Sequence, residues 1–235
     1  MELPLAVLWV GIVALLVAVL LIRVRVVDSR PPATPVAAAY IDAIARGDAD
    51  AARALFDPSR TRRAAGDLVD SETFTGAAAL ENATERISDV SIGITTGARN
   101  RPRSFVFFSY TLGGRRFENQ TIGLRWSAGA WSIDEGLTES LQVEPYFGGT
   151  PAPTTVRVVL GRAEATVPVP PVRRATFLAY PARYPLMIGA DGWLLDAASR
   201  MPETVTLAPT GGAELVVPRF GHGAADTLTP QGDRP

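Results

Sequence analysis

An uncharged, apolar run of 20 residues, LPLAVLWVGIVALLVAVLLI, lies at positions 3–22 of the 235-residue chain. A helix of this length spans roughly 30 Å, which is the thickness of the hydrocarbon core of a bilayer. Arg23 and Arg25 follow the run directly, without the small-residue cleavage site that ends a signal peptide. The run therefore predicts a single-pass transmembrane anchor over residues 1–27, in contact with membrane lipid, in preference to a buried core helix.

The composition excludes several kinds of site. Hydrophobic residues make up 47% of the chain, which is enough for packed cores, and a net charge of −1 without a basic block argues against a nucleic-acid partner. The chain has no cysteine, and its single histidine, His222, cannot form a multi-histidine metal site. All 23 basic residues are arginine, so lysine Schiff-base chemistry is impossible. We expect no cofactor and no metal.

Two short helices are predicted after a Pro-rich linker at residues 28–35. Pro35 suits the first position of a helix, Gly47 is a helix terminator, and Asp48 can cap a second helix. The first helix has one apolar stripe, formed by Val36, Tyr40, Ile41 and Ile44. A further helix is expected within residues 76–87, GAAALENATERI.

The pattern changes to strands after this point. Residues 87–97 alternate between apolar and polar types, with room for a β-bulge. The segment SFVFFSYTLGGRRFENQTIGLRW contains two β-rich runs around Gly113 and Gly114, which predicts a hairpin, and SAGAWSIDEG predicts a second one. Helices followed by an antiparallel meander are typical of an α+β layout with the helices on one face of the sheet.

The rest of the chain reads as a separate all-β region. Glycine and proline are dense in residues 144–155, EPYFGGTPAPTT, which indicates a domain boundary. Short β-like segments broken by Pro and Gly then fill residues 152–222, as in a small β-sandwich. The tail at residues 223–235 is expected to be disordered.

Residues 36–145 resemble the nuclear transport factor 2-like superfamily. The resemblance rests on AAAYIDAIARGDADAARALF as the opening helix pair, and on FVFFSYTLGG and LRWSAGAWSID as the closing strands. It implies a cone of curved antiparallel sheet wrapped by helices. The segment YPARYPLMIGADGW has a fainter resemblance to PEGA-type β-sandwich modules. The expected fold class is thus α+β: an N-terminal transmembrane helix, the cone, and a small all-β sandwich-like domain.

Enzymes of that superfamily, such as ketosteroid isomerase, use a carboxylate base and a hydrogen-bond donor in an apolar cavity inside the cone. No position of this chain matches those residues, so no catalytic residue is predicted. Polar residues that could face the cone are Tyr40, Asp42, Tyr110, Glu118 and Asp134. For the two tyrosines the alternative is a core position with the hydroxyl at the rim.

Three further residues are candidates for surface binding. Arg101 and Arg103 belong to a basic cluster, GARNRPRS, at a predicted hairpin tip, where they would contact anionic lipid or a polyanionic wall polymer or form a solvated loop. Trp126 lies five residues from Trp131, and the pair suits cross-strand packing or, alternatively, a platform for a sugar ring.

These observations predict a membrane-anchored binding or scaffolding protein of the bacterial cell envelope. Its partners would be membrane lipid, cell-wall polymer or envelope proteins, and no enzymatic activity is expected. The alternative is a membrane-tethered enzyme or small-ligand carrier that uses the cavity of the cone. The family resemblance favours a location outside the cytoplasm, whereas the arginines that follow the apolar run favour the inside.

Overall fold

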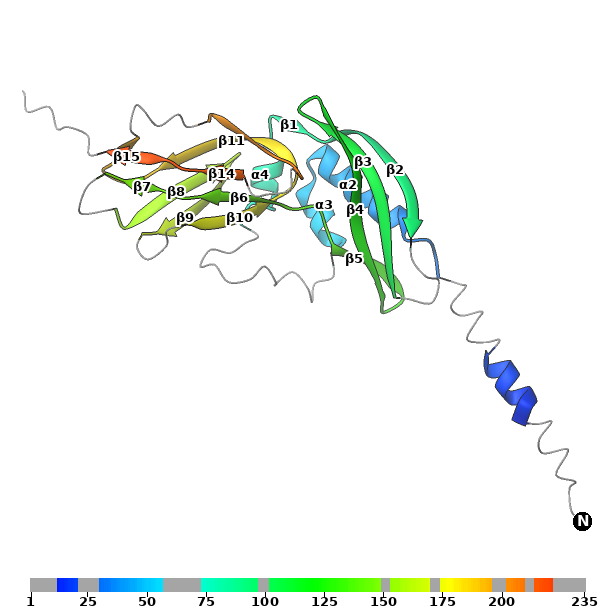
Figure 1. Ribbon diagram of the computed structural model, residues 1–235. Coiled ribbons are helices and arrows are strands. Elements are labelled where there is room, and N and C mark those ends of the chain that lie inside the picture. Colours follow the sequence, from blue (N-terminus) through cyan, green and yellow to red (C-terminus); the bar gives the residue numbers. More distant parts are fainter. Residues whose placement is uncertain are drawn as a thin grey trace, which may run out of the picture.

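The computed structural model describes residues 12–20, 30–56, 73–96, 102–148, 153–169, 174–195, 202–209 and 214–221. Two β-rich bodies lie end to end along the long axis of the molecule (Figure 1). A helix pair and a four-stranded sheet make up the first body, and a sandwich of short strands makes up the second.

The helices that follow the linker are α2 (Thr34–Arg46), α3 (Ala49–Ala54) and α4 (Ala77–Leu80). Gly47 ends α2 with a φ of 86°, a left-handed conformation that glycine adopts without strain. Asp48 Oδ1 accepts a hydrogen bond of 2.9 Å from the backbone N–H of Ala51 and so caps α3. The predicted break between the two helices is confirmed. The buried residues of α2 are Ala37, Tyr40, Ile41, Ala43 and Ile44.

The first body contains one antiparallel sheet in the order β2-β3-β4-β5. Its strands are β2 (Ser88–Thr96), β3 (Arg103–Leu112), β4 (Arg115–Ser127) and β5 (Ala130–Glu135). Gly113 and Gly114 both have positive φ, 61° and 70°, as a tight two-residue hairpin turn requires, which confirms the predicted β3–β4 hairpin. The sheet curves around α2, which covers one of its faces (Figure 1).

The second body is built from short strands that pair in three small sheets. One sheet has the order β1-β11-β8-β9, with β13 also paired to β11, and the others have the orders β10-β6-β14 and β12-β15-β7. The bounds are β1 (Glu85–Arg86), β6 (Glu139–Val143), β7 (Tyr146–Phe147), β8 (Thr155–Leu160), β9 (Ala163–Pro168), β10 (Ala175–Ala179), β11 (Ala182–Gly189), β12 (Leu194–Leu195), β13 (Thr204–Leu207), β14 (Glu214–Val216) and β15 (Arg219–Gly221).

Strands that precede the predicted domain boundary at residues 144–155 complete the second body. β1 pairs with β11, and β6 lies between β10 and β14. The ring centroids of Phe74 and Phe177 lie 4.8 Å apart, and those of Tyr40 and Tyr180 lie 6.3 Å apart. Tyr184 donates a hydrogen bond of 2.8 Å to the carbonyl of Tyr180. One continuous hydrophobic cluster therefore joins the two bodies.

The predicted α+β cone of the nuclear transport factor 2-like type was wrong. Of the residues that the structure describes, 54% are in strands and 20% in helices, so this part of the chain is mainly β, and its fold is β-sandwich-like. The helix expected within residues 76–87 is limited to the four residues of α4. Residues 85–86 of the same segment form the strand β1, which pairs with β11. Pairing between strands far apart in the sequence overrides the local helical pattern here.

The predicted transmembrane anchor was also wrong. Within the described residues, no helix is long and apolar enough to cross a membrane. Residues 12–20 of the apolar run are helical. The predicted single-pass location in the cell membrane depended on this anchor and was wrong for the same reason. The rest of the apolar run, His222 and the tail at 223–235 lie outside the described residues.

Candidate functional site on the outer face of the four-stranded sheet

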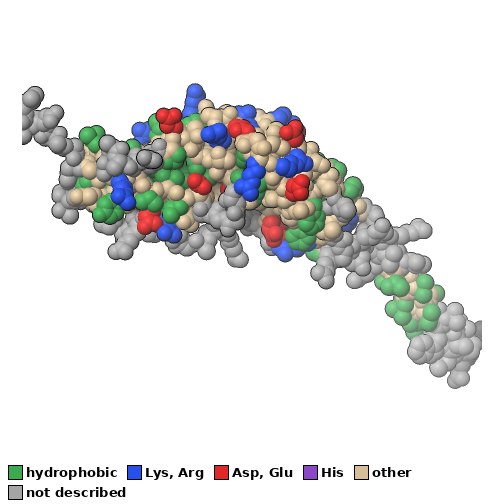
Figure 2. All heavy atoms as spheres, turned by 45° about the horizontal axis from the view of Figure 1, so that its top comes forward, with side chains coloured by type: hydrophobic (Ala, Val, Ile, Leu, Met, Phe, Trp, Pro, Cys, Tyr) green, Lys and Arg blue, Asp and Glu red, His purple; other side chains and the backbone are tan. Residues whose placement is uncertain are grey.

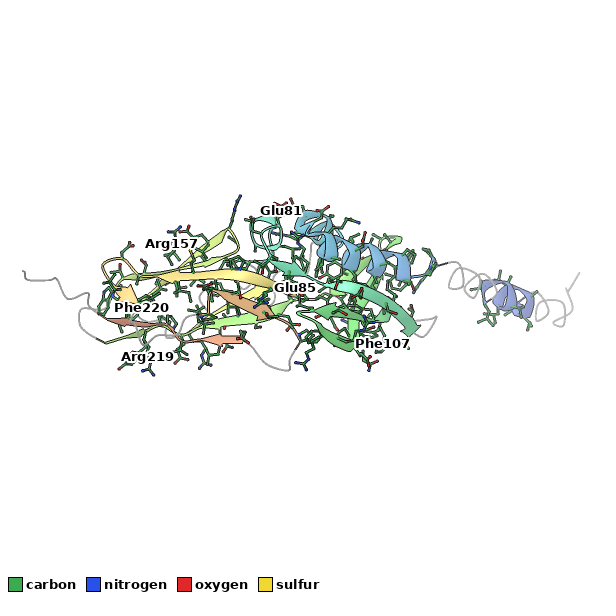
Figure 3. The ribbon with its side chains drawn as sticks, turned by 90° about the horizontal axis from the view of Figure 1, so that it is seen from above. Glu81, Glu85, Phe107, Arg157, Arg219 and Phe220 are labelled. Atoms are coloured by element: carbon green, nitrogen blue, oxygen red, sulfur yellow. The ribbon has the colours of Figure 1, made fainter. Side chains whose placement is uncertain are left out.

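The two faces of the four-stranded sheet differ in what they bury. Along β3 the even-numbered residues from Ser104 to Leu112 are buried, while the odd-numbered residues between them are partly accessible. The buried residues face α2. We call the side that carries Phe105, Phe107 and Ser109 the outer face, because it points away from the helices (Figure 3).

Tyr40 is part of the closed core under the sheet. Its hydroxyl accepts a hydrogen bond of 3.0 Å from the N–H of Leu137 and lies 3.5 Å from the carbonyl of the same residue. Its ring packs edge-on against Phe56, with centroids 5.5 Å apart. A Cβ added at Gly136 would lie 2.6 Å from the Tyr40 hydroxyl and 2.3 Å from Phe56, so this region has no spare volume. Tyr40 therefore does not line an open cavity.

Tyr110 is also buried among aromatic rings. Its centroid lies 5.9 Å from that of Phe108 and 5.3 Å from that of Phe117. Burial raises the pKa of Tyr110, and the nearby carboxylate of Glu139 raises it further, so the phenol stays neutral. Burial also raises the pKa of Glu139. A ligand could reach the Tyr110 hydroxyl only by displacing the aromatic core.

Trp126 and Trp131 pack edge-to-face at 5.4 Å near one end of the sheet. The indole N–H of Trp131 donates a hydrogen bond of 2.7 Å to the carbonyl of Pro31. The guanidinium of Arg30 lies 5.9 Å from the Trp126 ring centroid, within the range of a cation–π contact. The two indoles therefore hold residues 30–31 of the linker rather than form an open platform.

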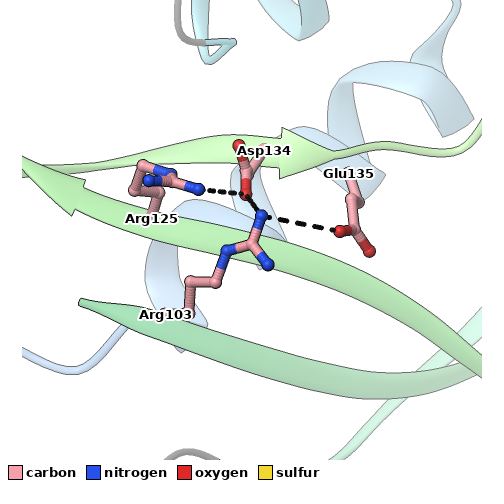
Figure 4. A network of polar contacts seen from close by, with 4 residues as sticks. All are labelled: Arg103, Arg125, Asp134 and Glu135. Atoms are coloured by element: carbon pink, nitrogen blue, oxygen red, sulfur yellow. Dashed lines mark hydrogen bonds and ion pairs between the residues drawn. The ribbon is translucent and has the colours of Figure 1, made fainter. Parts of the chain in front are cut away.

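Arg103 belongs to an ion-pair network on the outer face (Figure 4). Its Nη2 lies 2.7 Å from Asp134 Oδ2, and Arg125 Nη2 lies 3.3 Å from the same oxygen. Glu135 lies farther away, at 3.9 Å from Arg103. The Asp134 side chain is only 2% exposed, so Arg103 and Arg125 neutralise a buried carboxylate. Arg103 is thus not free for an anionic polymer, and Arg101 lies outside the described residues.

A shallow depression of about 170 Å³ opens on the same face. β-Bulges shape it on both sides of β3: in β4, Glu118 and Asn119 together oppose Ser109, and in β2, residues 93–94 together oppose Phe107. Asn119 has a φ of 56°, which asparagine tolerates better than most residues. Such bulges re-aim side chains. The residues that line the depression are Ser91, Gly93, Phe107, Phe108, Ser109, Glu118 and Asn119.

The polar groups of the depression are available to a ligand. Among the described residues, neither the Glu118 carboxylate nor the Asn119 carboxamide makes a side-chain hydrogen bond or ion pair. The Ser109 hydroxyl oxygen accepts a hydrogen bond of 2.5 Å from Arg116, which also donates to the carbonyl of Asp89 at 2.5 Å. Arg116 therefore fixes the hydroxyl at the floor and holds β2 against β3.

Glu118 and Asp134 were predicted as candidates for the inner face, but both lie on the outer face. The sequence contained a signal for the position of Glu118 on the outer face. Phe117 and Ile122 are five residues apart and would point to opposite faces of a regular strand, yet both are buried. Two apolar residues at an odd spacing indicate an extra residue between them, which is the bulge at 118–119. Asp42, by contrast, pairs with Arg46 on the exposed side of α2.

The described residues contain no cluster of three or more His, Asp or Glu side chains that could hold a metal ion. Comparisons with known proteins give little further guidance. No family model matches the chain, and no curated protein matches it. A minor pilin of Streptococcus agalactiae, GBS52, gives a structural match with a TM-score of 0.28 and 15% identity, over 55% of this chain and 71% of the pilin chain. A likeness this weak carries no argument about fold or function.

Proposed function

We propose that this protein is a non-enzymatic binding or scaffolding protein, and that the outer face of its four-stranded sheet binds a cell-wall polysaccharide. The observation that carries the proposal is the depression at Phe107. It combines a partly exposed ring with a carboxylate, a carboxamide and hydroxyls, and its Glu118 and Asn119 side chains have no partner within the described residues.

The state of the inner face supports binding over catalysis. An enzyme or a small-ligand carrier needs an open apolar pocket with converging polar groups. The Tyr40 hydroxyl accepts a hydrogen bond from the backbone N–H of Leu137, and the Tyr110 ring packs between those of Phe108 and Phe117. A pocket at these tyrosines would require loss of the core that joins the two bodies.

The charge of the surface favours a neutral polymer over a polyanion. On the face shown in Figure 2, arginine side chains lie among aspartate and glutamate side chains rather than in one stripe. On the outer face, Arg103 and Arg125 are paired with Asp134. A polyanion is held by clustered cations that are free to pair with it. Nucleic acid and acidic wall polymers are therefore not expected as partners.

Co-sedimentation of the full chain with purified peptidoglycan sacculi tests this proposal. Thr121 is exposed on β4 directly opposite Phe107, so Thr121→Glu adds bulk and charge beside the depression without disturbing the core. Thr166→Glu makes the same change at an exposed strand position of the second body and is the matched control. We expect wild type and Thr166→Glu to sediment with the sacculi, and Thr121→Glu to remain in the supernatant. No sedimentation of wild type, or equal sedimentation of both variants, would overturn the proposal.

A further inference from the structure

We propose that the depression at Phe107 is a subsite for a single neutral pyranose ring, such as one hexose or N-acetylhexosamine unit of a polysaccharide chain. This inference rests on the proposed function and adds the class of ligand and its position. The residues that would contact the sugar are Phe107, Ser91, Ser109, Glu118 and Asn119.

The size of the depression suits one ring. Its volume of about 170 Å³ is smaller than the roughly 300–1,000 Å³ of pockets that enclose whole drug-sized ligands. It is open at the surface, so one unit of a chain can sit in the hollow while the neighbouring units stay outside it. Gly93 keeps one wall low, because it places no side chain over the backbone of Phe107.

The groups that line the depression match the two kinds of surface that a pyranose ring has. The C–H face of the ring is apolar and can pack on Phe107. Its hydroxyls are both donors and acceptors. The Glu118 carboxylate offers two acceptor oxygens, and the Asn119 carboxamide offers a donor and an acceptor. Adjacent hydroxyls of a sugar can therefore satisfy both side chains at once.

The bulge in β4 is what brings these two side chains together. In a regular strand, Glu118 and Asn119 would point to opposite faces of the sheet. Here both line the depression, at the cost of a positive φ for Asn119. Strained or irregular backbone of this kind concentrates at functional sites.

Ser109 adds a donor of defined direction. Its oxygen accepts a hydrogen bond from Arg116, so the hydroxyl hydrogen remains to donate to a ligand. Arg116 acts here as a positioning residue. Its two acceptors are neutral oxygens, so Arg116 keeps its positive charge, and the carboxylate of Glu118 at the same depression opposes the attraction of that charge for anions.

An extended peptide is the competing ligand, since it could add to the edge of the sheet at β2. The edge is poorly suited to this. β2 has two register shifts within nine residues, and Asp89 has a φ of 47°, so its N–H and C=O groups do not form an even row. Bulges protect sheet edges from strand addition.

Titration calorimetry of the full chain with an N-acetylglucosamine trimer and a glucose trimer tests the inference, with a triglutamate peptide as the anionic peptide probe. Asn119→Gly removes the carboxamide while glycine retains the positive φ, so the bulge is kept. Phe107→Ala removes the stacking ring, and Thr166→Ala is the control in the second body. We expect at least one neutral trimer to bind, and each of the first two variants to weaken binding by about tenfold or more.

The outcomes separate this inference from the proposed function. If wild type sediments with sacculi but binds neither neutral trimer, the subsite assignment fails while the proposed function stands. If Asn119→Gly and Phe107→Ala bind the sugar as wild type does, the ring lies elsewhere and the assignment also fails. Glu118→Gln gives a further check: it should weaken neutral-sugar binding, whereas tighter binding of triglutamate would identify an anionic peptide site.

Discussion

Replacing Tyr40 with phenylalanine tests whether the inner face of the sheet is a closed core. The substitution keeps the ring and its contact with Phe56, so it creates no large cavity. It removes the oxygen that accepts the 3.0 Å hydrogen bond from the N–H of Leu137. A buried donor left without its partner costs about 1–3 kcal/mol of stability. The 3.5 Å contact to the Leu137 carbonyl is at the limit of a hydrogen bond and adds little.

Urea denaturation of wild type, Tyr40→Phe and a control measures this cost. Tyr146 is 61% exposed, so Tyr146→Phe should change the free energy of unfolding by less than about 0.5 kcal/mol. A loss of about 2 kcal/mol in Tyr40→Phe corresponds to a melting temperature lower by about 4–8 °C for a chain of this size. Unchanged stability of Tyr40→Phe, together with altered ligand binding, would show that Tyr40 belongs to a pocket and would refute the reasoning.

Two further predictions concern the core and its titration. Gly136→Ala should cost about 1–3 kcal/mol in urea denaturation, because the new Cβ meets Phe56 and Tyr40 at 2.3 and 2.6 Å, whereas Gly189→Ala faces open space and should be near neutral. Burial raises the pKa of Glu139, so the stability that its proton contributes is present below the unfolded pKa and is lost as the pH rises through the folded pKa. Glu139→Gln should therefore be more stable than wild type at neutral pH, with the difference shrinking near pH 4; a difference that grows towards low pH would contradict this.

Local signals in the sequence predicted local structure well. The helix break at Gly47 and Asp48 and the hairpin turn at Gly113 and Gly114 depend on the conformational preferences of one or two residues each. The pairing of distant segments was not predictable in this way. Glu85 pairs with Arg183, nearly a hundred positions later, and no local pattern marks that contact. The shift from the expected α+β cone to a mainly β fold arises from such pairings.

The candidate site was missed because a β-bulge was expected in residues 87–97 but none in the segment that forms β4. Tyr110 of β3 was predicted either to face the cavity of the cone or to occupy a core position, and in the structure it packs in the core with Phe108 and Phe117. The accessible polar groups come from bulges, which reverse the expected face of every residue beyond them. Glu118 and Asn119 share a face only for this reason.

Hydrogen–deuterium exchange of the full chain, with and without the sacculi or trimer that it binds, shows which face of the four-stranded sheet contacts the ligand. Binding on the outer face predicts slower exchange in residues 91–93, 107–109 and 118–121, which surround the depression. Exchange at Tyr40, on the buried side of α2, should not change. Protection confined to α2 and to residues 137–143, with none at 118–121, would place the ligand on the inner side and contradict the account.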